Sequence, residues 1–558
     1  MMRNKLLPLL LCCGLSSLMA QEELPSDTFR VVKEYQPTII DAKKIGFQPE
    51  INDTLKLEAE LNYTFIDKNV PVQFQVEPIA AARIKGEPLV KLYNGYARVG
   101  VGNAMVPFGE LYYSNLRSKK YAIGGHASYF NQRELNQIEA SGMSKAHVEV
   151  FGKRFWKANT LDASLSYDRH NLNYYGIYQQ AEALGIENPD IDDKTLEQAY
   201  DRLSGSLKLK STVRDSFNLR HEGEITYNYT ANANQGVEHN VVGNLNLNKF
   251  KNNELYSVDV LIDLNDYDFN PSNTIFAVKP QISTIGEKFR INAGLGIYMN
   301  ATSEADFHFY PIAEIKYNVL EDVIVPYVGV KGEMRRVNYS SITRENPFVA
   351  ENIALANSNE KFNIYAGIRG LISSKLSFNV SGAQSRTDNA FLYVQIPDSV
   401  YQLSKEFYLT YDEVDETKIK GELVYHLNEK VNVYAEGSYS EFETNEEEEA
   451  WHRPKLKLST SASYNLRDKI IVRLDMFYWG EQFARGVDPV TNGAITTYEF
   501  NKQSLDPIFD INLGFEYRYT KRISAFIDFN NIGGINYEKY QDYPLQGFNV
   551  WGGLTYGF

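Results

Sequence analysis

The stretch FNVWGGLTYGF, residues 548–558, decides the fold class of this chain. Apolar residues take every second position along it, and the residues between them are polar or small apart from one tryptophan. A period of two is that of a β-strand whose two faces meet different surroundings. In a chain with 39 tyrosines this pattern indicates a bacterial outer-membrane β-barrel, and we expect the outward residues to form a C-terminal insertion signal: Phe548, Val550, Leu554, Tyr556 and Phe558.

The same alternation recurs in the segments 289–300, 362–369, 456–465 and 510–518. Each is close to the length that a tilted membrane strand requires. We expect the apolar parity of each segment to face lipid and the polar or small parity to face the lumen. Charged residues of the inner parity would then set the charge selectivity of the lumen, and the lumen-facing candidates are Arg290, Arg369, Glu436, Glu516 and Arg518.

Turns and loops predict the topology. Tight polar turns near 373–374, 428–429, 467–468 and 520–521 alternate with long loops near 179–198, 337–359, 386–413, 442–455, 481–507 and 531–546. In outer-membrane barrels the short turns are periplasmic and the long loops extracellular. Counting strands between these connections predicts an all-β fold, a transmembrane antiparallel up-and-down β-barrel of about 22 strands over residues 91–558.

The first 90 residues differ from the rest of the chain in their sequence pattern. Residues 1–20 have the basic start, apolar stretch and small-residue end of a signal peptide, and both cysteines lie inside it, at Cys12 and Cys13. Residues 21–90 contain several prolines and only short apolar patches, which predicts an extended segment in the periplasm or inserted into the lumen. A barrel of this width is normally plugged, so either this segment and the loops fill it or a separate periplasmic or surface lipoprotein does.

Composition excludes several classes of protein. No apolar run after the signal approaches the roughly 20 residues of a membrane helix, and the mean hydropathy of −0.38 suits strands that alternate lipid-facing and lumen-facing residues. The net charge of −14 argues against nucleic acid as a partner. We therefore expect the cell outer membrane as the location, with outer-membrane lipids and the barrel assembly machinery as partners.

Motifs for chemistry are missing from the sequence. It contains no Gly-x-Ser-x-Gly, no His-Glu-x-x-His and no phosphate-binding loop, and its eight histidines are scattered singly. Residues 263–270 resemble the first half of a calcium loop but lack the turn glycine and the closing glutamate, so a solvated loop end is the simpler interpretation. Residues 446–449 are four glutamates that we expect to keep a loop hydrated. We predict no enzyme, no cofactor and no metal.

The last thirty residues carry a resemblance. Asn530-Asn531-Ile532-Gly533-Gly534, Tyr543-Pro544-Leu545-Gln546-Gly547 and the closing Leu554–Phe558 are similar to the end of TonB-dependent outer-membrane receptors, in which a second proline stands where Gln546 lies here. The resemblance implies a 22-stranded barrel. Those receptors carry a plug domain of well over a hundred residues, whereas only about seventy precede the first strand here, so the chain resembles a plug-less relative of the type found in Bacteroidetes.

Two functions are compatible with these observations. The first is a passive or partner-gated conduit for solutes. The second is a structural or assembly platform of an outer-membrane secretion or biogenesis complex, with a permanently filled lumen. Channel conductance of the purified barrel would favour the first, and a silent barrel that co-purifies with stable partners would favour the second.

Overall fold

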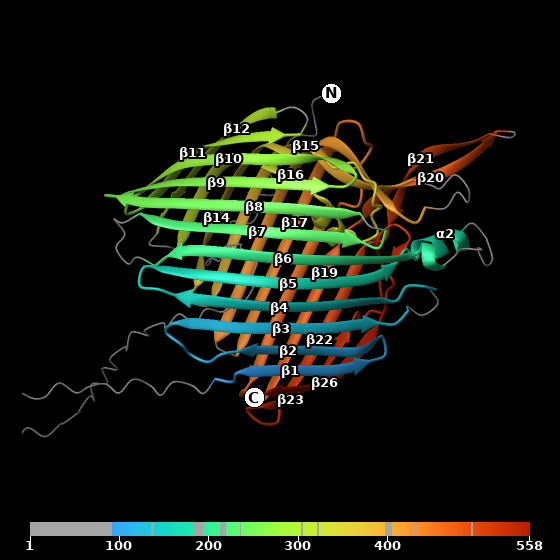
Figure 1. The fold of residues 1–558 in the computed structure, drawn as a ribbon, viewed down its shortest axis with the longest axis horizontal. Coiled ribbons are helices and arrows are strands. Elements are labelled where there is room, and N and C mark those ends of the chain that lie inside the picture. The colour runs from blue at the N-terminus through green and yellow to red at the C-terminus, as the bar shows by residue number, and fades with distance from the viewer. Residues whose placement is uncertain are drawn as a thin grey trace, which may run out of the picture. The chain divides into compact units, whose positions relative to one another are not determined.

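The computed structural model describes residues 92–558, except 135–138, 184–192, 213–218, 235, 303–304, 321–322, 397–403, 429 and 493–494. The expected signal peptide and the segment 21–90 lie outside the described residues. In the part that is described, 22 strands form one antiparallel sheet that closes into a barrel (Figure 1). The predicted fold class and strand number are therefore confirmed.

The strands pair with their neighbours in chain order. Those of the barrel are β1 (Gly95–Gly102), β2 (Met105–Ser114), β3 (Tyr121–Gln132), β4 (Met143–Phe155), β5 (Asn159–Asn173), β6 (Glu197–Ser211), β7 (Arg220–Asn232), β8 (Val237–Lys251), β9 (Glu254–Tyr267), β10 (Asn270–Ile285), β11 (Phe289–Ala301), β12 (Ala305–Tyr317), β13 (Ile324–Arg335), β14 (Ser358–Ser373), β15 (Leu376–Gln395), β16 (Phe407–Asn428), β17 (Val431–Thr444), β18 (Leu456–Leu466), β19 (Ile470–Trp479), β22 (Ile508–Arg518), β23 (Ile523–Asn530) and β26 (Asn549–Gly557).

Closure joins the first strand to the last. β1 pairs with β2 on one side and with β26 on the other, in a register that runs from Tyr96 opposite Gly557 to Gly102 opposite Trp551. Glycine is required at position 553 because a Cβ there would collide with the Val99 carbonyl group of the neighbouring strand. The closed sheet leaves no unpaired edge, which is the condition for a β-structure to lie in lipid.

The two faces of the wall differ as the alternation predicts. On β26, Leu554 is 57% exposed on the outer face, whereas its neighbour Thr555 is 5% exposed and hydrogen-bonded to Ser524 on the inner face. Of the residues expected to form the insertion signal, Val550 is half-buried and the others are exposed: Phe548, Leu554, Tyr556 and Phe558. An apolar outer face on a closed barrel is that of an outer-membrane protein.

The long loops lie at one end of the barrel, together with a few short turns, and the connections at the other end are all short. The long loops contain α2 (Gly176–Ala183), α3 (Tyr339–Glu345), the short 3-10 helix Asp193–Thr195, and two small hairpins outside the barrel sheet, β20 (Gln482–Asn492) with β21 (Ile495–Leu505) and β24 (Glu538–Tyr540) with β25 (Tyr543–Pro544). Neither described α-helix is long and apolar enough to cross a membrane. Figure 1 shows α2 and the β20–β21 hairpin at the same end of the barrel. By the rule for such barrels this end is extracellular.

Two loops differ from their expected extent. The loop expected at 386–413 is shorter, because β15 continues to Gln395 and pairs with the start of β16 at Phe407. The loop expected at 481–507 is largely the β20–β21 hairpin, which pairs from Gln482 opposite Leu505 outward. In the first place the ladder of hydrogen bonds extends further along the chain than the alternation of apolar residues does. In the second place a separate two-stranded sheet forms within the loop.

Candidate functional site

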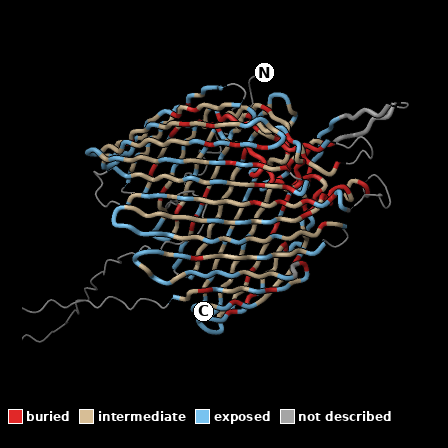
Figure 2. Tube along the Cα trace, in the orientation of Figure 1, coloured by how far each residue is buried: buried red, intermediate tan, exposed pale blue. Residues whose placement is uncertain are grey.

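The extracellular loops fold together at the mouth of the barrel. We call the cap the residues 174–183, 336–357, 404–406 and 537–545, which come from the β5–β6, β13–β14, β15–β16 and β23–β26 connections. The largest buried apolar cluster of the described residues joins the cap to the barrel wall and contains Leu172, Tyr174, Tyr175, Ile177, Ala181, Leu196, Tyr200, Tyr267, Val337, Tyr339, Ile342, Phe348, Val349, Ala350, Ile353, Tyr393, Phe407, Tyr540 and Tyr543. Figure 2 shows the buried residues gathering at this end. The cap therefore shares one hydrophobic core with the rim of the barrel wall.

Helix α3 is fixed to the inner wall through its first turn. Its N-cap residue Asn338 forms a capping box with Ser341, which satisfies two backbone N–H groups. The buried carboxylate of Glu238 on β8 accepts hydrogen bonds from the backbone N–H of Tyr339 at 2.7 Å and of Ser340 at 2.8 Å. The Tyr339 ring stacks on Tyr267 of β9 with centroids 4.6 Å apart. A single wall carboxylate therefore holds the positive end of the helix.

The other cap segments contact one another directly. The rings of Phe348 and Tyr543 stack with centroids 3.7 Å apart, which joins the β13–β14 loop to the β23–β26 loop. Val349 and Phe407 form an isolated parallel β-bridge. The side chain of Gln180 on α2 donates at 2.7 Å to the Ser404 carbonyl oxygen. Loops from four different connections thus form one packed unit.

One carboxylate of the cap has an altered acidity. Asp542 lies between β24 and β25, and Gln180 donates a hydrogen bond to it at 2.7 Å. Removal of water by the packed cap, and to a lesser degree the nearby charge of Glu538, raises the pKa of Asp542 to about 7. The stability of the packed cap therefore depends on the protonation of Asp542 near neutral pH.

Below the cap lies a cavity of about 850 Å³ between the cap and the inner wall. Its wall side is formed by inward residues of β2 to β6 and of β22, β23 and β26, and its roof by the end of α3 and by residues 537–546. The charged side chains of the lining carry both signs: Lys145, Arg169, Arg202, Arg344 and Lys539 are basic, and Asp168, Glu345 and Asp510 are acidic. A mixed lining with tyrosine and phenylalanine rings suits a polar organic solute better than a bare ion.

Two of the predicted lumen residues belong to a chain of ion pairs near the turn end. Glu516 contacts Arg518 at 3.2 Å and Arg473 at 3.6 Å, and Arg473 in turn contacts Asp528 at 3.4 Å. Asp528 also holds Arg98 of β1 at 2.8 Å. Glu516 and Arg518 line a second hollow of about 440 Å³ and do not line the cavity below the cap.

The other three predicted lumen residues are separate from these. Glu436 pairs with Lys420 at 3.3 Å on the neighbouring strand. Arg290 is exposed on β11 opposite Lys316 of β12. Arg369 is half-buried on β14. The structure thus distributes the five residues along the wall, and their part in charge selectivity remains a prediction.

Sequence reasoning missed the cap. The glutamates at 446–449 are not all hydrated, since Glu447 accepts from the Trp451 indole N–H at 2.7 Å and pairs with Arg485 at 3.2 Å. The acidic residues of the 263–270 stretch are engaged with protein groups, Asp263 with Arg336 at 3.1 Å and Asp266 with Ser272 at 2.5 Å. The signal that could have revealed the cap is the number of tyrosines and phenylalanines inside the long loops.

Comparison with known proteins agrees with the architecture. No protein-family model and no curated protein sequence matches the chain. Solved structures do match it. The siderophore receptor PirA from Acinetobacter baumannii has a TM-score of 0.62 and 10% identity, and the match covers 85% of this chain and 81% of PirA. The copper transporter OprC has a TM-score of 0.61 and 11% identity, with 84% of this chain and 81% of OprC covered; the ferripyoverdine receptor of Pseudomonas aeruginosa bound to ferripyoverdine has a TM-score of 0.60 and 11% identity, with 85% and 72% covered. The barrel of this chain is therefore similar in fold to the barrels of TonB-dependent outer-membrane receptors.

Proposed function

We propose that this chain is an outer-membrane conduit for solutes, in which the cap acts as the gate. The observation that carries the proposal is the cavity of about 850 Å³ directly beneath loops that pack against one another and against the rim of the wall. Structural neighbours described as a siderophore receptor and a copper transporter have the same barrel fold, which supports transport as the use of this lumen. A scaffold would not need a cavity between its wall and its surface loops.

Gating by a partner is part of the proposal. The core of the cap buries several aromatic rings completely, so its opening costs free energy that a solute or a protein partner has to supply. A partner from the periplasmic side, or a surface lipoprotein above the cap, would fit this requirement. We expect the segment 21–90 to narrow the channel from the periplasmic side, in place of the plug domain that a plug-less relative lacks. That segment lies outside the described residues.

Charge selectivity is proposed to arise at two levels. The lining of the cavity filters the solute first, and the ion-pair chain around Glu516 and Arg518 filters it near the turn end. Neutralising Glu516 with glutamine should then change the ratio of anion to cation permeability of the open barrel. The same substitution should leave the closed state of the cap unchanged, because this hollow and the cavity share no lining residue.

The test weakens the cap alone. Tyr543→Ala removes the ring that stacks on Phe348 and creates a void in the cap core, which should cost about 3–5 kcal/mol of cap stability. We expect higher single-channel conductance in planar bilayers and greater permeability of cells to large hydrophilic antibiotics. The matched control is Tyr519→Ala in a turn at the other end, where the side chain is 67% exposed.

The result also separates the two functions. If the Tyr543→Ala barrel assembles normally, stays silent and retains tightly bound periplasmic or surface partners, the conduit proposal is wrong and the platform function takes its place. Assembly is checked independently by the change in gel mobility on heating, which reports the folded barrel.

A further inference from the structure

Two histidine and three carboxylate side chains lie close together on the inner wall of β2 to β5. They are Glu110, His126, His147, Glu149 and Asp168. His126 stands directly opposite Glu149 across the β3–β4 pair, and His147 stands directly opposite Asp168 across the β4–β5 pair. Because side chains alternate along a strand, these residues share one face of the sheet.

That face is the lumen. Val148 and Val150, which alternate with His147 and Glu149 along β4, are 49% and 56% exposed on the outer surface. His147 and Asp168 line the cavity beneath the cap. The cluster is therefore reached from the same space that a solute would enter.

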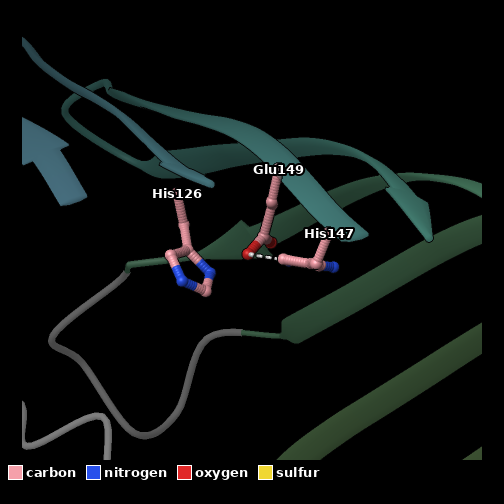
Figure 3. Close-up of side chains that lie close together, drawn as sticks. All are labelled: His126, His147 and Glu149. Carbon is pink, nitrogen blue, oxygen red and sulfur yellow. Dashed lines mark ion pairs between the residues drawn. The ribbon is translucent and has the colours of Figure 1, made fainter. Parts of the chain in front are cut away.

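Three of the side chains converge on one point. One potential ligand atom from each of His126, His147 and Glu149 lies within 4.8 Å of the other two. Figure 3 shows the Glu149 carboxylate between the two imidazole rings, with the ion pair from Glu149 Oε2 to His147 Nε2 at 4.0 Å. Ligand atoms of a tetrahedral zinc ion lie about 3.3 Å apart, given metal–ligand distances of about 2.0–2.1 Å. Small side-chain rotations would bring the three atoms to that spacing.

Supporting residues orient both rings. Asp168 Oδ1 lies 2.6 Å from His147 Nδ1, which leaves the Nε2 atom of that ring directed toward Glu149. A carboxylate that holds the distal nitrogen of a histidine is the usual support of a metal-binding imidazole. His126 stacks flat on Tyr112, with centroids 3.9 Å apart, and the Tyr112 hydroxyl donates at 2.8 Å to Glu110.

Hydrogen bonding alone does not account for the cluster. His126 Nε2 is buried without a hydrogen-bond partner in the described structure and lies 3.3 Å from a Glu110 oxygen. Among the described residues, no lysine or arginine forms an ion pair with Glu110, Glu149 or Asp168. Among the described residues the three carboxylates around the two imidazoles thus have no ion pair with a lysine or arginine, although Arg202 acts on Asp168 at longer range, and a buried nitrogen without a hydrogen bond needs an explanation.

We propose that His126, His147 and Glu149 bind a divalent first-row transition-metal ion, with zinc as the reference ion, on the lumen wall. Two imidazole nitrogens and a carboxylate are the ligands that such ions prefer, whereas calcium and magnesium prefer oxygen ligands alone. Asp168, Glu110 and Tyr112 are positioning residues for the two histidines. With only three protein ligands, at least one coordination position is left for water or for a donor group of a solute in the cavity.

The test titrates the mature, tag-free barrel, expressed with its signal peptide and purified from outer membranes in detergent, with zinc by calorimetry. Cysteine does not compete in the mature chain, because both cysteines lie in the expected signal peptide. We expect one saturable site per barrel, lost in His126→Ala and in His147→Ala, and weakened about 10- to 100-fold in Asp168→Asn. The matched control is His308→Ala, which removes an inward histidine on β12 that belongs to no such cluster among the described residues.

A second measurement guards against variants that fail to assemble. Cobalt bound in place of zinc gives visible absorption that depends on the number and type of its ligands, and the milder His126→Gln should alter this spectrum in a barrel that remains heat-modifiable. Zinc binding that is absent in the parent barrel, or that persists with unchanged affinity in assembled His126→Gln and His147→Gln barrels, would overturn the proposal.

Discussion

Replacing Glu238 with glutamine should loosen the cap while leaving the barrel intact. Glu238 is 1% exposed, and its two carboxylate oxygens accept the backbone N–H groups of Tyr339 at 2.7 Å and Ser340 at 2.8 Å. Glutamine is nearly isosteric but has one acceptor oxygen in place of two. Its amide N–H₂ group would face a backbone N–H at the start of α3, and the favourable charge at this helix end would be lost.

The magnitude follows from these contacts. A hydrogen bond to a charged group contributes about 1.5–3 kcal/mol, and the interaction with the helix dipole adds a few tenths of a kcal/mol or more. Relief from burying a charge offsets part of this loss. We expect a net loss of about 2–3 kcal/mol in the free energy that keeps the cap closed, which corresponds to a roughly 30- to 150-fold larger open fraction, since about 1.4 kcal/mol is a factor of ten.

Hydrogen exchange read by mass spectrometry measures this directly. Peptides covering residues 336–357 should exchange faster by that factor in Glu238→Gln, whereas peptides from β11 and β12 at mid-wall should not change. The matched control is Glu224→Gln on β7, which removes a carboxylate paired with Lys208 at 3.5 Å and 34% exposed. Cap exchange that changes less than threefold in an assembled Glu238→Gln barrel would refute the assignment of this carboxylate as the anchor of α3.

Three further changes test other parts of the account. The folded cap raises the pKa of Asp542 to about 7 and so favours its protonated form; the stabilisation from this group is complete below about pH 4 and is lost as the pH rises through 7. Asp542→Asn should therefore flatten the rise in hydrogen exchange of the cap between pH 5 and 8. Asparagine suits the observed φ of +63° at this position. Arginine at the outward Ile364 should destabilise the barrel by about 2–4 kcal/mol near the bilayer midplane in denaturant titrations, whereas arginine at the inward Asn363 should be tolerated, and equal effects would mean that the two faces are reversed. Aspartate at Tyr556 and Phe558, both exposed on the outer face of the closing strand, should abolish heat-modifiable barrel in outer-membrane fractions, and normal insertion would contradict the proposed signal.

The wall of the barrel could be predicted from the sequence because its physical signal is local. Each outward residue such as Ile364 or Leu554 faces lipid and each inward neighbour does not, so apolar and polar residues alternate with a period of two along the strands. Turn residues mark the strand ends, and the count of 22 strands follows from them. The strand ends above the membrane were less visible, as β15 shows by continuing to Gln395, because no lipid imposes alternation there.

The cap and the histidine cluster could not be predicted in the same way. The cap depends on contacts between segments far apart in the chain, such as Phe348 with Tyr543 and Val349 with Phe407, and no local pattern encodes these pairs. The cluster depends on strand register: His126 lies opposite Glu149 only because β3 and β4 pair in one register out of several. Histidines that are scattered along the sequence therefore converge only in the folded wall.

A reversible lock on the cap tests the central claim most directly. Val349 and Phe407 form a parallel β-bridge, and bridged strands lie about 4.7–4.9 Å apart, which is within the Cα–Cα range of about 4.4–6.8 Å that a disulfide spans. In the Val349→Cys, Phe407→Cys double variant, loss of the buried phenylalanine weakens the cap when the thiols are reduced, and the disulfide closes it when they are oxidised. The single variants, which cannot form this bond, control for the effects of the reductant.

The measurement is single-channel conductance of the double variant under alternating reduction and oxidation. If the chain is a conduit gated by its cap, conductance appears on reduction and disappears on oxidation in the same membrane. Conductance that is equal in the two states, whether high or absent, would contradict the account, because the cap would then not control passage through the lumen.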